Sequence, residues 1–179
     1  MGRTMVRLAI IFSDGTEEIE AVTVIDGLRR AGAVCDIVSE KGEYLTGSHG
    51  IVIKSDKALK EFSVSDYDGI IIPGGMPGAS NISANEKAID EIKKAANSGK
   101  LVASICASPA VVLAKHGICK GKRVTCFPAE SFIKTVKTVA VYTGNDVEKD
   151  GNFITANGPL SATKFAIAIA DYFGLKINF

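Results

Sequence analysis

Short apolar runs that end at polar, glycine-containing turns recur along the sequence. Runs of this kind are typical of buried strands in a parallel sheet, where both faces of the sheet are covered. They are residues 6–12, Val34–Ser39, Gly69–Ile72 and Leu101–Ile105. Segments with apolar residues at helical spacing lie between and after these runs. They are the segment from Asp14 to about Ala31, Glu86–Asn97, and residues 109–115 and 161–173.

Local signals mark the ends of several of these helices. Asp14-Gly15-Thr16-Glu17 resembles a capping box at the start of the first helix, and Gly32 follows its predicted end. Gly99 closes the polar-faced helix Glu86–Asn97, and Pro159 lies near the start of the last helix. The boundaries are therefore predicted by residue chemistry as well as by periodicity.

The remaining segments have weaker patterns. Residues 44–54 and 57–62 are irregular and are predicted as loops with edge strands. Residues 137–143 and 152–156 flank a turn-rich segment, in which Asp150-Gly151 marks a tight turn.

The alternation of strands and helices predicts an α/β fold with a mostly parallel sheet and helices on both faces. The length predicts one domain over residues 1–179. Ligands of such sheets bind at the carboxyl ends of the strands. Three segments end at that edge, and they are residues 13–20, 73–78 and 105–108.

Composition excludes several classes of partner. Hydrophobic residues make up 46% and charged residues 23% of the sequence, and the formal net charge is +1. Lys and Arg form no cluster, so neither nucleic acid nor an anionic membrane is an expected partner. The apolar runs are too short for a bilayer span or a secretory signal. A cytoplasmic location is therefore predicted.

The cysteines also favour a reducing compartment. None of the four forms a C-x-x-C pair, and only His49 and His116 could join them as zinc ligands, so no metal site is expected. Free thiols fit the cytosol. The four are Cys35, Cys106, Cys119 and Cys126.

Cys106 is the strongest single signal for chemistry. It directly follows the apolar run Leu101–Ile105 and precedes a helix that contains Pro109, which is the layout of a nucleophile elbow. A helix N-terminus favours the thiolate, so the pKa of Cys106 is predicted to lie below that of a free cysteine. The alternative is a buried, inert thiol, which is the expected state of the other three cysteines.

A thiol nucleophile needs a proton partner, and the first helix offers three glutamates. Glu17 is expected to be engaged in the capping box with Asp14, and Glu18 lies at the edge of the inward-facing stripe. Glu20 lies on that stripe, where burial would raise its pKa and suit it to proton exchange with a thiol. The alternative is that all three only complement the helix dipole.

Backbone donors and histidines complete the candidate chemistry. Gly74 and Gly75 could bring N–H groups close to a reacting oxygen and, with the N–H of Ala107, form an oxyanion site, although turns use Pro-Gly-Gly widely. His116 is expected to cap a helix end. His49 lies in a loop and is more often a surface residue in that setting.

Together these residues resemble the DJ-one/ThiJ/PfpI superfamily along nearly the whole chain, closest to its DJ-one branch. The stretches that carry the likeness are residues 14–20, 29–32, 73–75, 103–109, 147–151 and 157–159. The resemblance implies a flavodoxin-like three-layer α/β sandwich, a homodimer, and a reactive Cys106 with protonated Glu20 as its partner. It also implies backbone donors at Gly75 and Ala107. Candidate pocket residues on the same ground are Gly74, Phe127, His49, Arg30 and Pro159.

Two positions depart from relatives in a way that bears on function. The peptidase branch carries a histidine directly after the nucleophile, where this chain has Ala107, and some DJ-one relatives have a histidine where Phe127 stands. Both differences argue against a Cys-His peptidase or a class I amidotransferase.

The resemblance implies two functions that use the same residues. One is a cofactor-free glyoxalase or deglycase acting on methylglyoxal and related 2-oxoaldehydes, with protection against oxidative stress. The other is a non-enzymatic redox sensor or chaperone in which Cys106 is oxidised. The predicted dimer would use the outer face of the first helix, where Ile19 and Val22 point away from the core-facing stripe.

Overall fold

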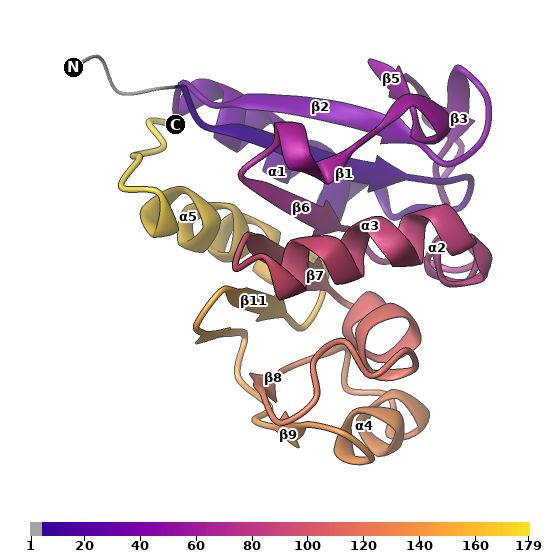
Figure 1. Ribbon diagram of the computed structural model, residues 1–179, viewed down its shortest axis with the longest axis vertical. Helices are drawn as coiled ribbons and strands as arrows, with labels where there is room; N and C mark the ends of the chain where they lie inside the picture. Colours follow the sequence, from indigo (N-terminus) through magenta and orange to yellow (C-terminus); the bar gives the residue numbers. More distant parts are fainter. Residues whose placement is uncertain (1–4) are drawn as a thin grey trace.

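The computed structural model describes residues 5–179; residues 1–4 of the predicted domain lie outside it (Figure 1). Its main sheet has the strand order β10-β11-β7-β6-β1-β2-β5. Every neighbouring pair is parallel except the hairpin β10-β11, which confirms the predicted mostly parallel sheet. The strands are β1 (Arg7–Phe12), β2 (Val34–Ser39), β5 (Lys57–Ala58), β6 (Gly69–Ile72), β7 (Leu101–Ile105), β10 (Val147–Asp150) and β11 (Phe153–Ala156).

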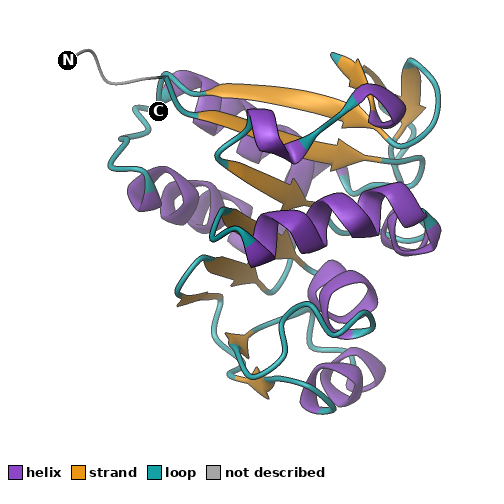
Figure 2. Ribbon diagram, in the orientation of Figure 1, coloured by secondary structure: helices purple, strands orange, loops and turns teal. Residues whose placement is uncertain are grey.

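Helices cover both faces of this sheet, which gives three layers (Figures 1 and 2). Along β1, side chains alternate between two apolar cores because successive residues of a strand point to opposite faces. Leu8, Ile10 and Phe12 pack on one side, and Ala9 and Ile11 on the other. The first side is covered by α1 (Glu18–Arg30) and α5 (Ala162–Tyr172), and the second by α2 (Gly78–Ala84), α3 (Glu86–Asn97), the π-type helix η3 (Pro109–Ala114) and α4 (Glu130–Lys137).

Smaller elements lie outside the three layers. Two short two-stranded sheets are β3 (Tyr44–Thr46) with β4 (Val52–Lys54), and β8 (Arg123–Val124) with β9 (Val141–Tyr142). The single 3-10 turns are η1 (Leu59–Glu61), η2 (Val64–Asp66) and η4 (Pro159–Ser161). Of the irregular segments in which edge strands were predicted, only β5 joins the main sheet, while β3 and β4 form a separate hairpin.

Several predicted elements have the predicted bounds, and they are β2, β6, β7 and α3. Others were missed. Helices α2 and α4 were not predicted, and in neither does a backbone N–H donate to an N-cap side chain. Strand β10 lies in the segment predicted as turn-rich and was also missed. Its only apolar residue is Val147, so it lacks the apolar run by which a buried strand is recognised. The turn that follows it is tight as predicted, with Gly151 at φ +59°.

The start of α1 differs from the prediction. Glu17 itself is the N-cap, and its Oε1 accepts a hydrogen bond from the Ile19 N–H at 2.9 Å. Asp14 instead accepts from the Thr46 N–H at 2.8 Å, so it holds the β3 strand. The predicted capping box between Asp14 and Glu17 is therefore wrong. A short side chain at either position satisfies whichever backbone N–H the tertiary fold brings nearest.

The end of α1 is as predicted. Gly32 has φ +85°, its N–H donates to Arg29, and the Ala33 N–H donates to Leu28. This is a Schellman motif, in which a left-handed residue satisfies the last carbonyl groups of the helix. Among the helices in residues 5–179, none is long and apolar enough to cross a membrane.

The substitution Gly32→Ala isolates the cost of this left-handed turn. A Cβ at Gly32 would have no atom within 4 Å, so the substitution adds strain without a clash. We expect the free energy of unfolding to fall by roughly 1–2 kcal/mol, measured by urea denaturation. Gly32→Asn should lose less, because asparagine tolerates this conformation. An alanine variant as stable as the wild type would contradict the assignment.

Candidate active site

Cys106 lies at the carboxyl end of β7, in a turn that leads into η3. Its φ is +65°, and it is the only non-glycine residue between 5 and 179 with a positive φ. Its N–H donates to the Ala156 carbonyl at 2.9 Å, and its carbonyl accepts from the Phe127 N–H at 2.8 Å. Strained backbone of this kind concentrates at functional sites. The structure thus has the strand-turn-helix geometry of the predicted nucleophile elbow.

The Glu20 side chain enters the same place from the first turn of α1. It is completely buried, its Oε2 accepts a hydrogen bond from the Gly74 N–H at 2.8 Å, and its carboxyl is hydrogen-bonded to the Cys106 thiol. A Cβ at Gly74 would lie 2.5 Å from both the Cys106 Cβ and the Glu20 Oε2. Only glycine therefore fits between the thiol and the carboxyl.

Backbone donors surround the sulfur. The N–H groups of Gly75 and Ala107 both donate to the Cys106 side chain. Gly75 has φ +88°, and a Cβ there would lie 2.4 Å from the Glu17 nitrogen. The Ser108 hydroxyl donates to the Pro73 carbonyl at 2.5 Å and joins the two turns that carry these donors.

The electrostatics of the thiol differ from the prediction. Burial and the neighbouring Glu20 carboxylate raise the pKa of Cys106 to about 12, although the N–H groups of Gly75 and Ala107 oppose the shift. Burial raises the pKa of Glu20 to about 7, despite hydrogen bonds from Cys106 and Gly74. The predicted rise for Glu20 is confirmed. The predicted fall for Cys106 is wrong, because desolvation and a nearby negative charge outweigh the helix N-terminus.

The two groups therefore titrate as a pair. One proton leaves near neutral pH, and the second is held strongly because its loss would place two negative charges side by side. The hydrogen bond between Glu20 and Cys106 lets the remaining proton reside on either group. The thiolate form is stabilised when Glu20 holds the proton and donates it in a hydrogen bond.

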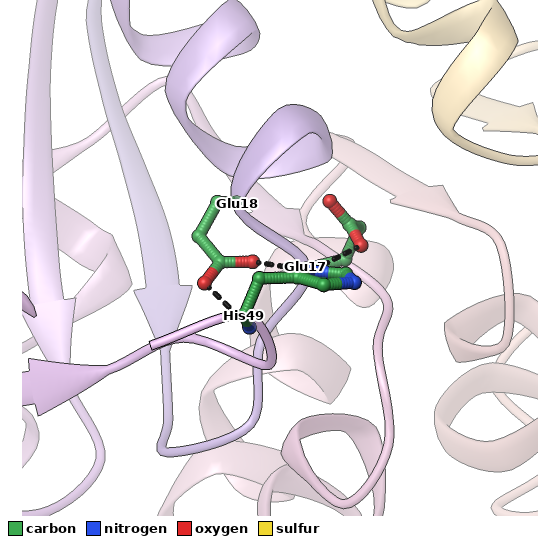
Figure 3. A group of neighbouring side chains, drawn as sticks. All are labelled: Glu17, Glu18 and His49. Carbon is green, nitrogen blue, oxygen red and sulfur yellow. Dashed lines mark hydrogen bonds and ion pairs between the residues drawn. The ribbon is translucent and has the colours of Figure 1, made fainter. Parts of the chain in front are cut away.

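His49 lies outside this arrangement and contacts other glutamates of α1 (Figure 3). Its Nδ1 is 3.0 Å from Oε2 of Glu18 and 3.3 Å from Oε2 of Glu17. The carboxyl of Glu18 is buried beneath residues 47–51 and accepts from the N–H groups of His49 and Ile51. Burial alone would raise the pKa of Glu18, but these hydrogen bonds and that of its own N–H lower it to about 2.

Two other predicted pocket residues line the same cavity. Phe127, which is hydrogen-bonded to the Cys106 carbonyl, and Pro159 line a hollow of about 510 Å³ together with Pro128, Gly158 and Leu160. Arg30 is not brought to the site within one chain. It lies at the other end of α1, roughly 15 Å along the axis from Glu20, and pairs with Asp26 at 2.7 Å.

The role of Glu18 was not predicted from the sequence. Glu18 lies at the edge of the helical stripe, and its partners are about thirty residues away, so periodicity gave no signal for its burial. His116 contacts a helix end as expected, and that end belongs to α2: its Nε2 lies 3.1 Å from the carbonyl of Ser83, in the last turn of α2, and 3.0 Å from the Ser83 hydroxyl.

Comparison with known proteins agrees with this fold. The sequence matches the DJ-1/PfpI family over residues 6–172. It is 38% identical to protein DJ-1 homolog B of Arabidopsis thaliana over 169 residues, which covers 93% of this chain and 38% of the relative. It is 34% identical to protein dj-1beta of Drosophila melanogaster, covering 90% of this chain and 86% of the relative. The chain thus spans well under half the length of the Arabidopsis protein.

Solved structures show the same architecture. The crystal structure of Drosophila melanogaster DJ-1beta superposes with a TM-score of 0.89 at 33% identity, covering 94% of this chain and 90% of that one. Oxidized Toxoplasma gondii DJ-1 gives 0.87 at 35% identity, covering 94% and 91%. The expected flavodoxin-like sandwich is confirmed, and the chain belongs to the DJ-1/PfpI family.

Proposed function

We propose that the protein is a cysteine-dependent, cofactor-free enzyme of the glyoxalase or deglycase type, acting on methylglyoxal and related 2-oxoaldehydes. The strongest support is the set of groups that surround the Cys106 sulfur. A carboxyl that titrates near neutral pH lies on one side, and the N–H groups of Gly75 and Ala107 lie on another. Nucleophile, proton carrier and oxyanion donors are the three parts that this reaction needs.

The first step forms a bond between sulfur and carbon. The Cys106 sulfur adds to the aldehyde carbon of the substrate, and the aldehyde oxygen becomes a hydroxyl by taking the proton that Cys106 and Glu20 share. The product is a hemithioacetal. The N–H groups of Gly75 and Ala107 stabilise the oxyanion while it forms.

The later steps move a proton and add water. The Glu20 carboxylate removes the proton from the former aldehyde carbon, and the ketone oxygen takes up a proton, which gives an enediol. Glu20 then returns a proton to the neighbouring carbon, while the hydroxyl on the sulfur-bearing carbon loses its proton and becomes a carbonyl. The result is a thioester of a 2-hydroxy acid on Cys106. Hydrolysis releases the acid and restores the thiol, so the sum is one 2-oxoaldehyde and one water converted to one 2-hydroxy acid. The cavity beside Phe127 and Pro159 is the proposed place for the substrate's substituent.

Peptidase chemistry has less support. Ala107 stands where a Cys-His peptidase would carry its base. The two histidines are engaged elsewhere, His49 with the carboxylates of Glu17 and Glu18 and His116 with Ser83. Neither is positioned by a contact to Cys106.

A redox function is the second candidate, and one observation favours it. Cys106 is partly exposed, whereas Cys35, Cys119 and Cys126 are buried. Peroxide that oxidises Cys106 to the sulfinate would create an anion that the N–H groups of Gly75 and Ala107 and a protonated Glu20 could hold. Four free cysteines also fit the proposed cytoplasmic location.

We also propose a homodimer through α1. Ile19 and Val22 are 55% and 43% exposed, on the face of the helix opposite Ala21, Val24 and Leu28, which are completely buried. The β3-β4 hairpin is anchored beside this face by the Ser48 N–H, which donates to the Thr16 carbonyl. Large apolar side chains gathered on one surface mark interaction sites.

Turnover of methylglyoxal tests the enzyme directly. Wild type should form lactate without glutathione or added metal, and Cys106→Ser should form none above background. Glu20→Gln should fold but lose about 10²-fold or more in kcat, the usual size of a general acid–base effect. A Cys106→Ser variant with wild-type activity, or Glu20→Gln within twofold of wild type, would exclude the mechanism.

The protonation of Glu20 also has a stability signature. Because the folded protein raises the pKa of Glu20 from its ordinary 4.5 to about 7, its stabilising contribution is full below pH 4.5 and is lost as pH rises through 7. The stability of Glu20→Gln relative to wild type should therefore rise between pH 4.5 and about pH 7 and stay higher above it, measured by urea unfolding. Glu61→Gln, at an exposed position in η1, is the control and should follow the wild-type curve.

The dimer is tested by placing charge on α1. Wild type should be dimeric at micromolar concentration in sedimentation equilibrium. Replacing Ile19 and Val22 with lysine should give monomers with reduced activity. The free energy needed to desolvate two ammonium groups in the interface would exceed the free energy gained from the contact. Replacing the exposed Val141 with lysine, on β9, should leave the dimer intact. A monomeric wild type would refute the arrangement.

A further inference from the structure

Three side chains of types that can bind metal ions meet at the start of α1. The proposed reaction does not use them. They are Glu17 and Glu18, which are adjacent in the chain, and His49 from the loop after β3 (Figure 3). One ligand atom from each lies within 4.8 Å of the other two. The sequence predicted no metal site on the basis of its cysteines and histidines alone. That prediction did not include a combination of one imidazole with carboxylates.

Each carboxylate is held by backbone N–H groups through Oε1, while Oε2 faces His49. Oε2 of Glu18 also accepts from the Ser48 hydroxyl at 3.2 Å, and that hydroxyl lies 3.1 Å from Nδ1 of His49. Oε1 of Glu17 accepts from the Ile19 N–H at 2.9 Å as the helix N-cap. Oε1 of Glu18 accepts from the N–H groups of His49 and Ile51, at 2.7 and 3.3 Å. The Oε2 atoms of both glutamates are directed at Nδ1 of His49. Ligands held in place by backbone hydrogen bonds are typical of metal sites.

The spacing suits a small cation as well as a proton. Zinc binds nitrogen and carboxylate oxygen at about 2.0–2.2 Å, so neighbouring ligand atoms of a tetrahedral site are roughly 3.3–3.5 Å apart. The two distances from Nδ1 of His49 are 3.0 and 3.3 Å. A cation would replace the imidazole proton. Small movements of the exposed His49 ring would lengthen the distances from Nδ1 to the two carboxylate oxygens to those of a tetrahedral site.

We infer that Glu17, Glu18 and His49 form a binding site for a divalent transition cation of the zinc type. One imidazole and two carboxylates with an open fourth position are a ligand set that zinc accepts. Imidazole also suits Cu²⁺ and Ni²⁺, whereas Mg²⁺ and Ca²⁺ need six or more oxygen ligands. The His49 side chain is 71% exposed in the single chain. The site is independent of catalysis at Cys106.

Calorimetric titration with Zn²⁺ tests this in the full chain carrying Cys106→Ser, which removes the reactive thiol as a competing ligand. We expect one zinc per chain. Adding His49→Arg should weaken binding at least about tenfold, because arginine keeps the ion pairs with both carboxylates but cannot ligate zinc. Glu17→Gln in the same background should weaken binding at least about tenfold as well, and it preserves the size of the side chain.

Two controls make the result specific. His116→Gln should bind zinc as its parent does, since His116 contacts Ser83 on the opposite side of the sheet. Mg²⁺ should give no binding heat. The inference is overturned if the Cys106→Ser parent binds no zinc, or if both His49→Arg and Glu17→Gln bind it with unchanged affinity. Thermal melting without metal checks that each variant is folded; if His49→Arg is not, Glu17→Gln decides.

Discussion

Placing the Glu20 carboxyl in the interior is the constraint around which the site is arranged. A buried carboxyl without partners is costly, and here it has the Gly74 N–H and the Cys106 thiol. The first requires a glycine at position 74, since any side chain would overlap both the sulfur-bearing residue and the carboxyl. The second requires Cys106 to leave the end of β7 with a positive φ. The turns after β6 and β7 are thus shaped by the same buried group.

The first turn of α1 divides its three acids among different tasks. Glu17 caps the helix, Glu18 holds the hairpin loop through backbone hydrogen bonds, and Glu20 reaches the thiol. Helical geometry separates these directions by about 100° per residue, so neighbouring positions face different surroundings. Changing the helix register by one residue would misplace all three. The number of residues between the end of β1 and Glu20 is therefore a geometric requirement of the site.

The sequence predicted what depends on local pattern and missed what depends on distant partners. Buried strands such as β6 and β7 were predictable because each is a continuous apolar run, and Glu20 because it falls on the inward stripe of α1. The pKa of Cys106 was not predictable from its helix N-terminus, because the opposing carboxylate comes from an element some eighty-six positions earlier. The burial of Glu18 and the capping by Glu17 were not predicted for the same reason. Several local hydrogen-bonding arrangements were equally compatible with the sequence, and tertiary contacts determine which of them forms.

Glu18 and Glu20 are two residues apart, yet their pKa values lie near 2 and near 7. The stabilising contribution of Glu18 is present above its ordinary pKa of 4.5 and is lost only as pH falls toward 2. Across the range in which Glu20 gains or loses its proton, Glu18 stays a fixed anion and the hairpin stays docked. The molecule therefore keeps a permanent charge and a variable charge on one helical turn. A change in pH therefore alters the protonation of the Glu20–Cys106 pair while Glu18 keeps its hydrogen bonds to the hairpin loop.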